Sequence, residues 1–216
     1  MRPAVFTVPV PDASAICASQ TTAGPAALII NGTLLDQQTL QISSKRIALL
    51  PGIQRILTFA SAGNLAGVNF TIIGKDTSSQ AVTEVVAGPN SNGTVASVNQ
   101  YHEVDSVTAS GTVATAVTVG TGTNASTQWW TPDIYADPFN IGLFAEITAT
   151  LNATVQYTPE DPNVPSTVVA FNHPTMAAIT SNTDGNIAFP VSGVRAIVNS
   201  ANASGVFKFT IIQAGV

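Results

Sequence analysis

The stretch GVNFTII, residues 67–73, returns in nearly the same form as GVFKFTII, residues 205–212. Each copy follows another apolar run from which it is separated by a few small residues. Short apolar runs rich in Val, Ile, Thr and Phe and divided by Gly, Asn and Ser are typical of β-strands. The two stretches therefore predict a β protein in which one structural element is used twice.

A longer comparison sets QRILTFASAGNLAGVNFTII (54–73) beside VRAIVNSANASGVFKFTII (194–212). The matching positions are Arg55 and Arg195, Phe70 and Phe209, and Ile72 and Ile211. We interpret each segment as a strand, a turn of small residues and a second strand, which together form a β-hairpin. Chance similarity between two hairpins of like composition is the alternative.

The rest of the chain continues the same pattern from Ala27 onward, with runs such as ALIIN, TLQIS, RILTF, TVATAVTVG, LFAEITATL and STVVAF. In FKFTI the residues Phe207, Phe209 and Ile211 alternate with Lys208 and Thr210, which predicts a strand with one buried face and one solvent-exposed face. No window of helical length carries an apolar stripe at spacings of three and four. The fold class predicted is all-β, with antiparallel sheets in a β-sandwich or jelly roll.

One run departs from clean alternation. In VTEVVAG, the charged Glu84 stands between Val82 and Val86 at a spacing of two. Side chains two apart on a strand point to the same side. We therefore expect that these three residues do not share one environment and that this strand is less regular.

The predicted organisation is two β-sandwich domains in series, and one larger jelly roll is the rival arrangement. Residues 1–25 contain several prolines and predict an extended N-terminal arm, because proline withholds a backbone donor. The first sandwich is expected over residues 26–120 and the second over residues 141–216. Residues 121–140 interrupt the strand rhythm and are predicted to be a linker or long loop.

The composition limits the classes of function. Only 9% of the 216 residues are charged, against about 25% in typical proteins, and the net charge is −5. Phosphate binding needs clustered Lys and Arg, but the only adjacent basic residues are Lys45 and Arg46, so a nucleic-acid partner is not expected. No apolar run is long enough to span a membrane, and the start shows no secretory signal. The single cysteine, Cys17, cannot form an internal disulfide.

Residues suited to catalysis are few. His102 adjoins Glu103 and lies near Asp105, but on a strand only the two acids share a side, where they suit a solvated edge. His173 precedes a proline and is expected in a turn.

SNTDGN (181–186) partly resembles a calcium loop but lacks the closing glutamate, so we predict a hairpin turn. Neither a zinc motif nor a GxSxG elbow is present. We expect no enzyme activity, no catalytic residue, no cofactor and no metal.

The most distinctive local feature is QWWTPDIY and the aromatic residue that follows it, which together contain Trp129, Trp130, Tyr135 and Phe139. Aromatic side chains in loops are enriched at the centres of interfaces. These four residues are the predicted intersubunit contact. Two alternatives stay open: a tryptophan that covers the core of the second half, and a platform on which a sugar ring stacks.

Several segments resemble structural proteins of tailed-bacteriophage virions. They are FTIIGKD, AVTEVVAGPNSNGTVAS and YHEVDSVTAS within residues 67–120, and the closing VSGVRAIVNSANASGVFKFTIIQAGV within residues 190–216. The likeness lies in the order of the strands and in their amino-acid sequences, and not in a diagnostic motif. No catalytic residues define that class, so none is carried over to this chain.

The resemblance implies a capsid decoration, or cement, protein that binds the major capsid protein and stabilises the shell. Such proteins often act as trimers, so a homo-oligomer is expected. The location implied is the capsid surface of the virion, after synthesis in the cytoplasm of the bacterial host. A tail, head-to-tail adaptor or fibre component, with a carbohydrate-binding surface, is the alternative.

Overall fold

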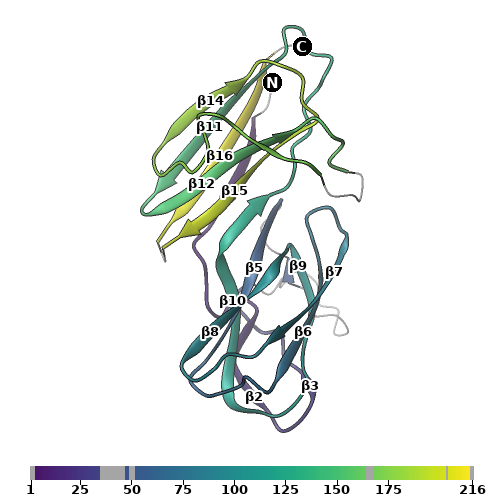
Figure 1. Cartoon of the computed structure of the whole chain (residues 1–216), viewed down its shortest axis with the longest axis vertical. Helices are drawn as coiled ribbons and strands as arrows, with labels where there is room; N and C mark the ends of the chain where they lie inside the picture. The colour runs from purple at the N-terminus through teal and green to yellow at the C-terminus, as the bar shows by residue number, and fades with distance from the viewer. Residues whose placement is uncertain (1–2, 35–46, 49–51, 164–167, 203, 215–216) are drawn as a thin grey trace. The chain divides into compact units, whose positions relative to one another are not determined.

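The computed structural model describes residues 3–34, 47–48, 52–163, 168–202 and 204–214. Every regular element in these ranges is a β-strand, and the paired strands run antiparallel. The predicted all-β, antiparallel fold class is therefore confirmed (Figure 1). Within the described residues no helix is long and apolar enough to cross a membrane. Lys45, Arg46 and the predicted strand TLQIS (39–43) lie outside these ranges.

The chain forms two compact units, and their limits differ from the predicted domains. One unit combines residues 1–10 with residues 123–216, and we call it the split unit. The other comprises residues 11–122, and we call it the inserted unit. The units are thus not arranged one after the other along the sequence, because the second is inserted into the first.

The split unit has two sheets. The first has the strand order β1-β16-β11-β14, and the second contains β13-β12-β15 with the end of β10 beside β15. The bounds are β1 (Ala4–Val8), β11 (Asn140–Thr148), β12 (Leu151–Thr158), β13 (Phe171–Asn172), β14 (Thr183–Ile187), β15 (Gly193–Ala201) and β16 (Val206–Ala214). Phe207, Phe209 and Ile211 are at most 1% exposed, while Lys208 and Thr210 face solvent, which confirms the predicted alternation.

The inserted unit also has two sheets. One has the order β3-β9-β6-β7 with β4 against β9, and the other contains β8, β5, the start of β10 and β2. The bounds are β2 (Cys17–Thr22), β3 (Ala26–Ala27), β4 (Ile47–Ala48), β5 (Ile53–Ser61), β6 (Asn69–Lys75), β7 (Ala81–Ala87), β8 (Gly93–Tyr101), β9 (Glu103–Ala109) and β10 (Val113–Thr127). Phe59 of β5 and Phe70 of β6 stack in its core, with ring centroids 4.9 Å apart.

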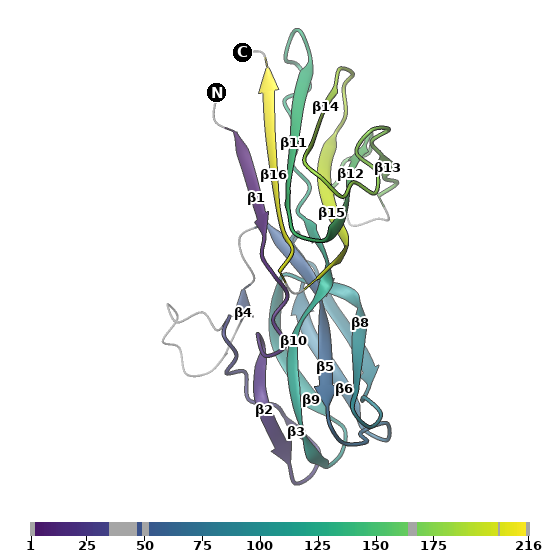
Figure 2. The same ribbon diagram turned by 90° about the vertical axis from the view of Figure 1, so that its left-hand side faces the viewer.

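The predicted N-terminal arm over residues 1–25 is wrong. β1 pairs along its whole length with β16, as Figure 2 shows, and β2 pairs with β10. In β1 the side chains of Phe6 and Val8 are buried, and Val5 and Thr7 are exposed. The prolines flank this strand and do not interrupt it, so they do not prevent pairing.

The predicted linker over residues 121–140 is also wrong in its first part. β10 continues to Thr127, where Ala125 and Ser126 pair with β15. Only residues 128–139 lack a regular strand. The long run of Thr and Val in β10 has no internal turn residue that would end it, because its glycines are accommodated within the strand.

The repeated segments form two strands each, as predicted, but neither is a hairpin. β5 pairs with β8 and β6 pairs with β7 and β9, so the two strands belong to different sheets. In the same way β15 pairs with β12, and β16 pairs with β1 and β11. Both turns of small residues therefore carry the chain from one sheet to the other within a unit.

The two repeated segments are structurally equivalent in their second strands only. Phe70 and Phe209 are both fully buried at matching positions. Arg55, however, lies on the buried side of β5 and is 2% exposed, whereas Arg195 alternates with the buried Val194 and Ala196 and lies on the outer side of β15. The two arginines are therefore not equivalent.

Glu84 shares the inner side of β7 with Val82 and Val86, contrary to the expectation of mixed environments. Its carboxylate accepts hydrogen bonds from the backbone N–H groups of Val98 (2.7 Å) and Asn99 (3.0 Å). It also accepts a longer hydrogen bond from the hydroxyl of Tyr101. The carboxylate is stable at this position because it satisfies backbone donors of β8, where the register with β5 shifts.

Replacing Glu84 by glutamine should lower the free energy of unfolding by about 1.5–3 kcal/mol, since hydrogen bonds to a charged acceptor are lost. Hydrogen exchange of the Val98 and Asn99 amides should accelerate, which amide-resolved exchange would measure. The control is Glu146→Gln, which breaks an exposed ion pair and should cost at most about 1 kcal/mol. Unchanged protection of both amides would contradict this role.

Candidate functional site

Trp129 packs within the split unit, on the outer side of β15. The guanidinium carbon of Arg195 lies 4.4 Å from the centre of its ring, and a Cβ on Gly193 would lie 3.1 Å from its Cε3 atom. The Nε–H of Arg195 donates to Gln156, whose side-chain amide donates to Asn172, each at 3.0 Å. These contacts explain why Trp129 is only partly exposed. They lie on the outer side of β15 and do not bear out the alternative of a tryptophan that covers the core of the second half.

The other three residues of the predicted contact differ in their exposure. Trp130 is half-buried, and its backbone exchanges two hydrogen bonds with Val194. Tyr135 is 89% exposed and Phe139 is half-buried. None of the stacked or edge-on ring pairs in the described residues includes any of the four. Their role in an intersubunit contact stays a prediction.

The two histidines hold the backbone in place. Nδ1 of His102 lies 2.7 Å from the carbonyl oxygen of Ile53, and Nε2 of His173 lies 3.1 Å from that of Asn186. Because a carbonyl only accepts, each of these nitrogens carries the proton. Glu103 pairs with Lys75 at 3.7 Å. The described residues contain no group of three or more His, Cys, Asp or Glu that could hold a metal ion.

The predicted turn at SNTDGN is wrong, because Asp184 and Gly185 lie inside β14. A Cβ on Gly185 would lie 2.9 Å from both His173 and Met176, so the glycine is needed for close packing beneath the strand. This placement leaves the carboxylate of Asp184 on the solvent side of the sheet, opposite Phe144 of β11.

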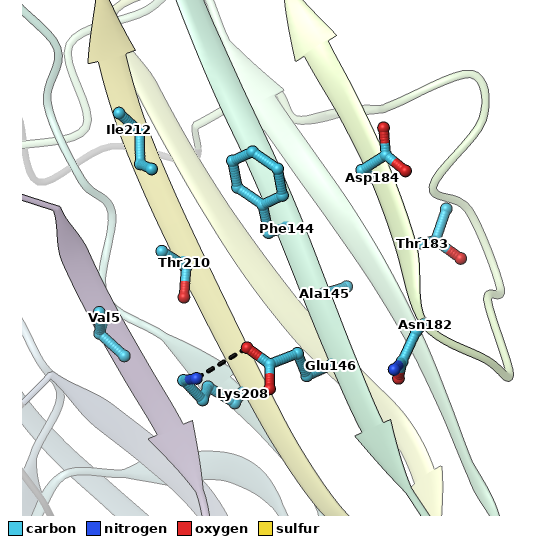
Figure 3. A pocket seen from close by; sticks show the side chains of 10 residues that line it. All are labelled: Val5, Phe144, Ala145, Glu146, Asn182, Thr183, Asp184, Lys208, Thr210 and Ile212. Atoms are coloured by element: carbon cyan, nitrogen blue, oxygen red, sulfur yellow. Dashed lines mark hydrogen bonds and ion pairs between the residues drawn. The ribbon is translucent and has the colours of Figure 1, made fainter.

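The solvent side of the sheet β1-β16-β11-β14 contains a shallow hollow of about 540 Å³, which we call the Phe144 groove (Figure 3). The strand register places Val5, Thr210, Phe144 and Asp184 in one row across the four strands. Beside this row, Nζ of Lys208 lies 2.7 Å from Oε1 of Glu146. The groove therefore surrounds an aromatic ring with carboxylate, hydroxyl and ammonium groups.

Sequence reasoning found only part of this groove. The alternation in β16 predicted that Lys208 and Thr210 lie on a solvent-exposed face, which the structure confirms. The partners of β16 could not be inferred, because β1, β11 and β14 come from distant parts of the chain. The wrong turn assigned to Asp184 also removed that residue from consideration.

No family model matches the sequence, and no curated protein is similar at a significant level. Among solved structures, the chain is similar to a point mutant of Bacillus subtilis oxalate decarboxylase OxdC. The sequence identity is 9%, the match covers 96% of this chain and 79% of that chain, and the TM-score is 0.18. A TM-score this low carries no argument about function.

Proposed function

We propose that this chain is a structural subunit of a tailed-bacteriophage virion, and that it decorates the capsid without acting as an enzyme. The proposal rests first on the resemblance of residues 67–120 and 190–216 to virion structural proteins. The low share of charged residues supports it, because such a surface gives little long-range repulsion between packed subunits.

The observation that carries the proposal is a sheet surface in the inserted unit that is uncharged over most of its area, with Lys75, Glu103 and Asp105 at one end of the same side. Outward side chains of β6, β7 and β9 form this surface, which we call the uncharged face, and they are Thr71, Ile73, Thr83, Val85, Ser106 and Thr108. Val85 is 60% exposed and Ile73 is 44% exposed. The cores of protein interfaces are depleted of charge in the same way. The face therefore suits contact with another protein subunit.

The partner proposed is the major capsid protein, and the decorating species is a homo-oligomer, with a trimer implied by the resemblance. The location is the capsid surface, after synthesis in the host cytoplasm. In this role the mechanism is mechanical, because the subunit adds buried contact area across joints of the shell. A tail, adaptor or fibre position is the alternative, and the Phe144 groove is the feature that favours it.

Immunogold labelling of purified virions with an antibody against this chain tests the placement. Label over the head is the expected result, label at the tail supports the alternative, and absence from the particle overturns both.

The uncharged face is tested separately with a Val85→Glu variant. A buried unpaired carboxylate is costly, so shell occupancy should fall at least about tenfold. A Thr94→Glu variant, which adds the same charge at an exposed position on β8, should bind normally. Both variants should keep the wild-type melting temperature. Equal occupancy for the two variants would remove the uncharged face from the interface.

A further inference from the structure

We propose that the Phe144 groove binds a neutral oligosaccharide, with a sugar ring stacked on Phe144. The proposal does not depend on a capsid position, because it concerns the split unit alone. The sequence suggested Trp129 and Trp130 as a platform for a sugar ring. The proposal instead places the sugar-binding surface at the Phe144 groove, which those two residues do not line.

The floor of the groove is apolar and shaped by a glycine. Phe144 is 42% exposed, and it belongs to none of the ring pairs among the described residues. A Cβ on Gly142 would lie 3.2 Å from Cε2 of this ring, so the ring leans over the glycine. Ile212 lies beside it on the neighbouring strand β16, and Val5 lies farther along the groove on β1, beyond β16 (Figure 3). An exposed aromatic face next to aliphatic side chains suits the apolar C–H face of a pyranose.

The rim supplies hydrogen-bonding groups of both kinds. The carboxylate of Asp184 and the hydroxyl of Thr210 make no side-chain hydrogen bond with any residue that the structure describes. Asn182 uses Oδ1 to accept from the backbone of Ile147 at 2.7 Å, which leaves its NH₂ group as a donor. Sugar hydroxyls both donate and accept, so they match this mixed set. The hollow of about 540 Å³ is within the usual range of ligand sites, about 300–1,000 Å³.

Charge selects a neutral ligand. Lys208 is committed to Glu146, so Asp184 is left as the uncompensated charge on the rim. An acidic sugar or a nucleic acid would therefore meet repulsion and no free cation within the groove. A peptide strand cannot add at the centre of the groove, because β11 and β16 are paired on both sides and offer no backbone groups there; the free edges are on β1 and β14.

The test is saturation-transfer NMR on the full chain, followed by titration. The probes are neutral tetrasaccharides of glucose, galactose and N-acetylglucosamine, with a hyaluronan tetrasaccharide as the acidic comparison. We expect transfer to at least one neutral probe and none to the acidic one. Phe144→Ala should weaken binding at least about tenfold, because the stacked ring surface is lost. Phe144→Leu, which keeps an apolar side chain, should also weaken it.

The matched control is Phe189→Ala, since Phe189 is 50% exposed and packs edge-on against Tyr157, away from the groove residues. This variant should bind the neutral probe like the wild type. Three results would overturn the proposal: no transfer to any neutral probe, equal weakening in Phe189→Ala, or a Phe144→Ala variant that changes the oligomeric state in sedimentation while no probe binds. The last result would mean that the groove joins two copies of the chain.

Discussion

Replacing Phe6 by alanine should lower the free energy of unfolding of the split unit by about 3–5 kcal/mol, the range for a buried phenylalanine in a close-packed core. Phe6 is 7% exposed and lies opposite Phe209 in the pairing of β1 with β16. Both tryptophans of the chain, Trp129 and Trp130, belong to the split unit. Urea unfolding followed by tryptophan fluorescence therefore reports on this unit.

The control for Phe6 is its neighbour Val5, which lies on the opposite side of the same strand and is 49% exposed. Val5→Ala should cost less than about 1 kcal/mol, as expected for a side chain that remains largely in water. If Phe6→Ala were equally mild, the N-terminal segment would behave in solution as the detached arm predicted from its prolines, and β1 would not contribute to the core.

The second large effect concerns Cys17, whose stability contribution should disappear at high pH. Burial in the core of the inserted unit raises the pKa of this thiol from 9.0 to about 12. The unfolded chain loses the thiol proton above pH 9, whereas the folded chain keeps it until about pH 12. The contribution is therefore complete below pH 9 and is lost between pH 9 and about 12, at about 1.4 kcal/mol per pH unit.

Urea unfolding of the wild type and a Cys17→Ala variant, under reducing conditions from pH 8 to 10.5, measures this effect. The Cys17→Ala variant should be less stable than the wild type by an amount that does not depend on pH, because packing in the core is lost. Its free energy of unfolding should, however, fall less with rising pH than that of the wild type. Other buried groups also titrate here: burial and Glu84 raise the pKa of Tyr101, and burial lowers that of Arg55 to about 10. Both are present in the two proteins, so their contributions cancel in the comparison. Parallel pH profiles would contradict the assignment.

The sequence predicted which residues form strands better than which strands meet. In β16 the alternation of Phe207 and Phe209 with Lys208 and Thr210 is a local property, and it was predicted correctly. Pairing is not local: β5 and β6 follow each other closely, yet they lie in different sheets. A run of small residues fits a tight hairpin and a crossing between sheets equally well, so the hairpin interpretation failed twice in the same way.

The candidate site shows the same limit. The aromatic residues near Trp129 are adjacent in sequence, and that adjacency drew attention to them, although Tyr135 and Phe139 do not join the tryptophans in a ring cluster. The groove around Phe144 combines residues from both ends of the chain, including Val5 and Ile212. The environment of Glu84 could not be predicted for a similar reason. The backbone N–H groups of Val98 and Asn99 stabilise its carboxylate, and backbone groups leave no pattern in the amino-acid sequence.

The pairing of β1 with β16 has a consequence for synthesis on the ribosome. Ala4 is made long before its partner Ile211, and almost all of the described chain is translated in between. The inserted unit has all of its own strands by residue 122 and is free to fold long before that. Until β16 is made, Phe6 and Val8 remain exposed to water without their core partners, so the nascent chain carries an apolar segment that is prone to aggregation.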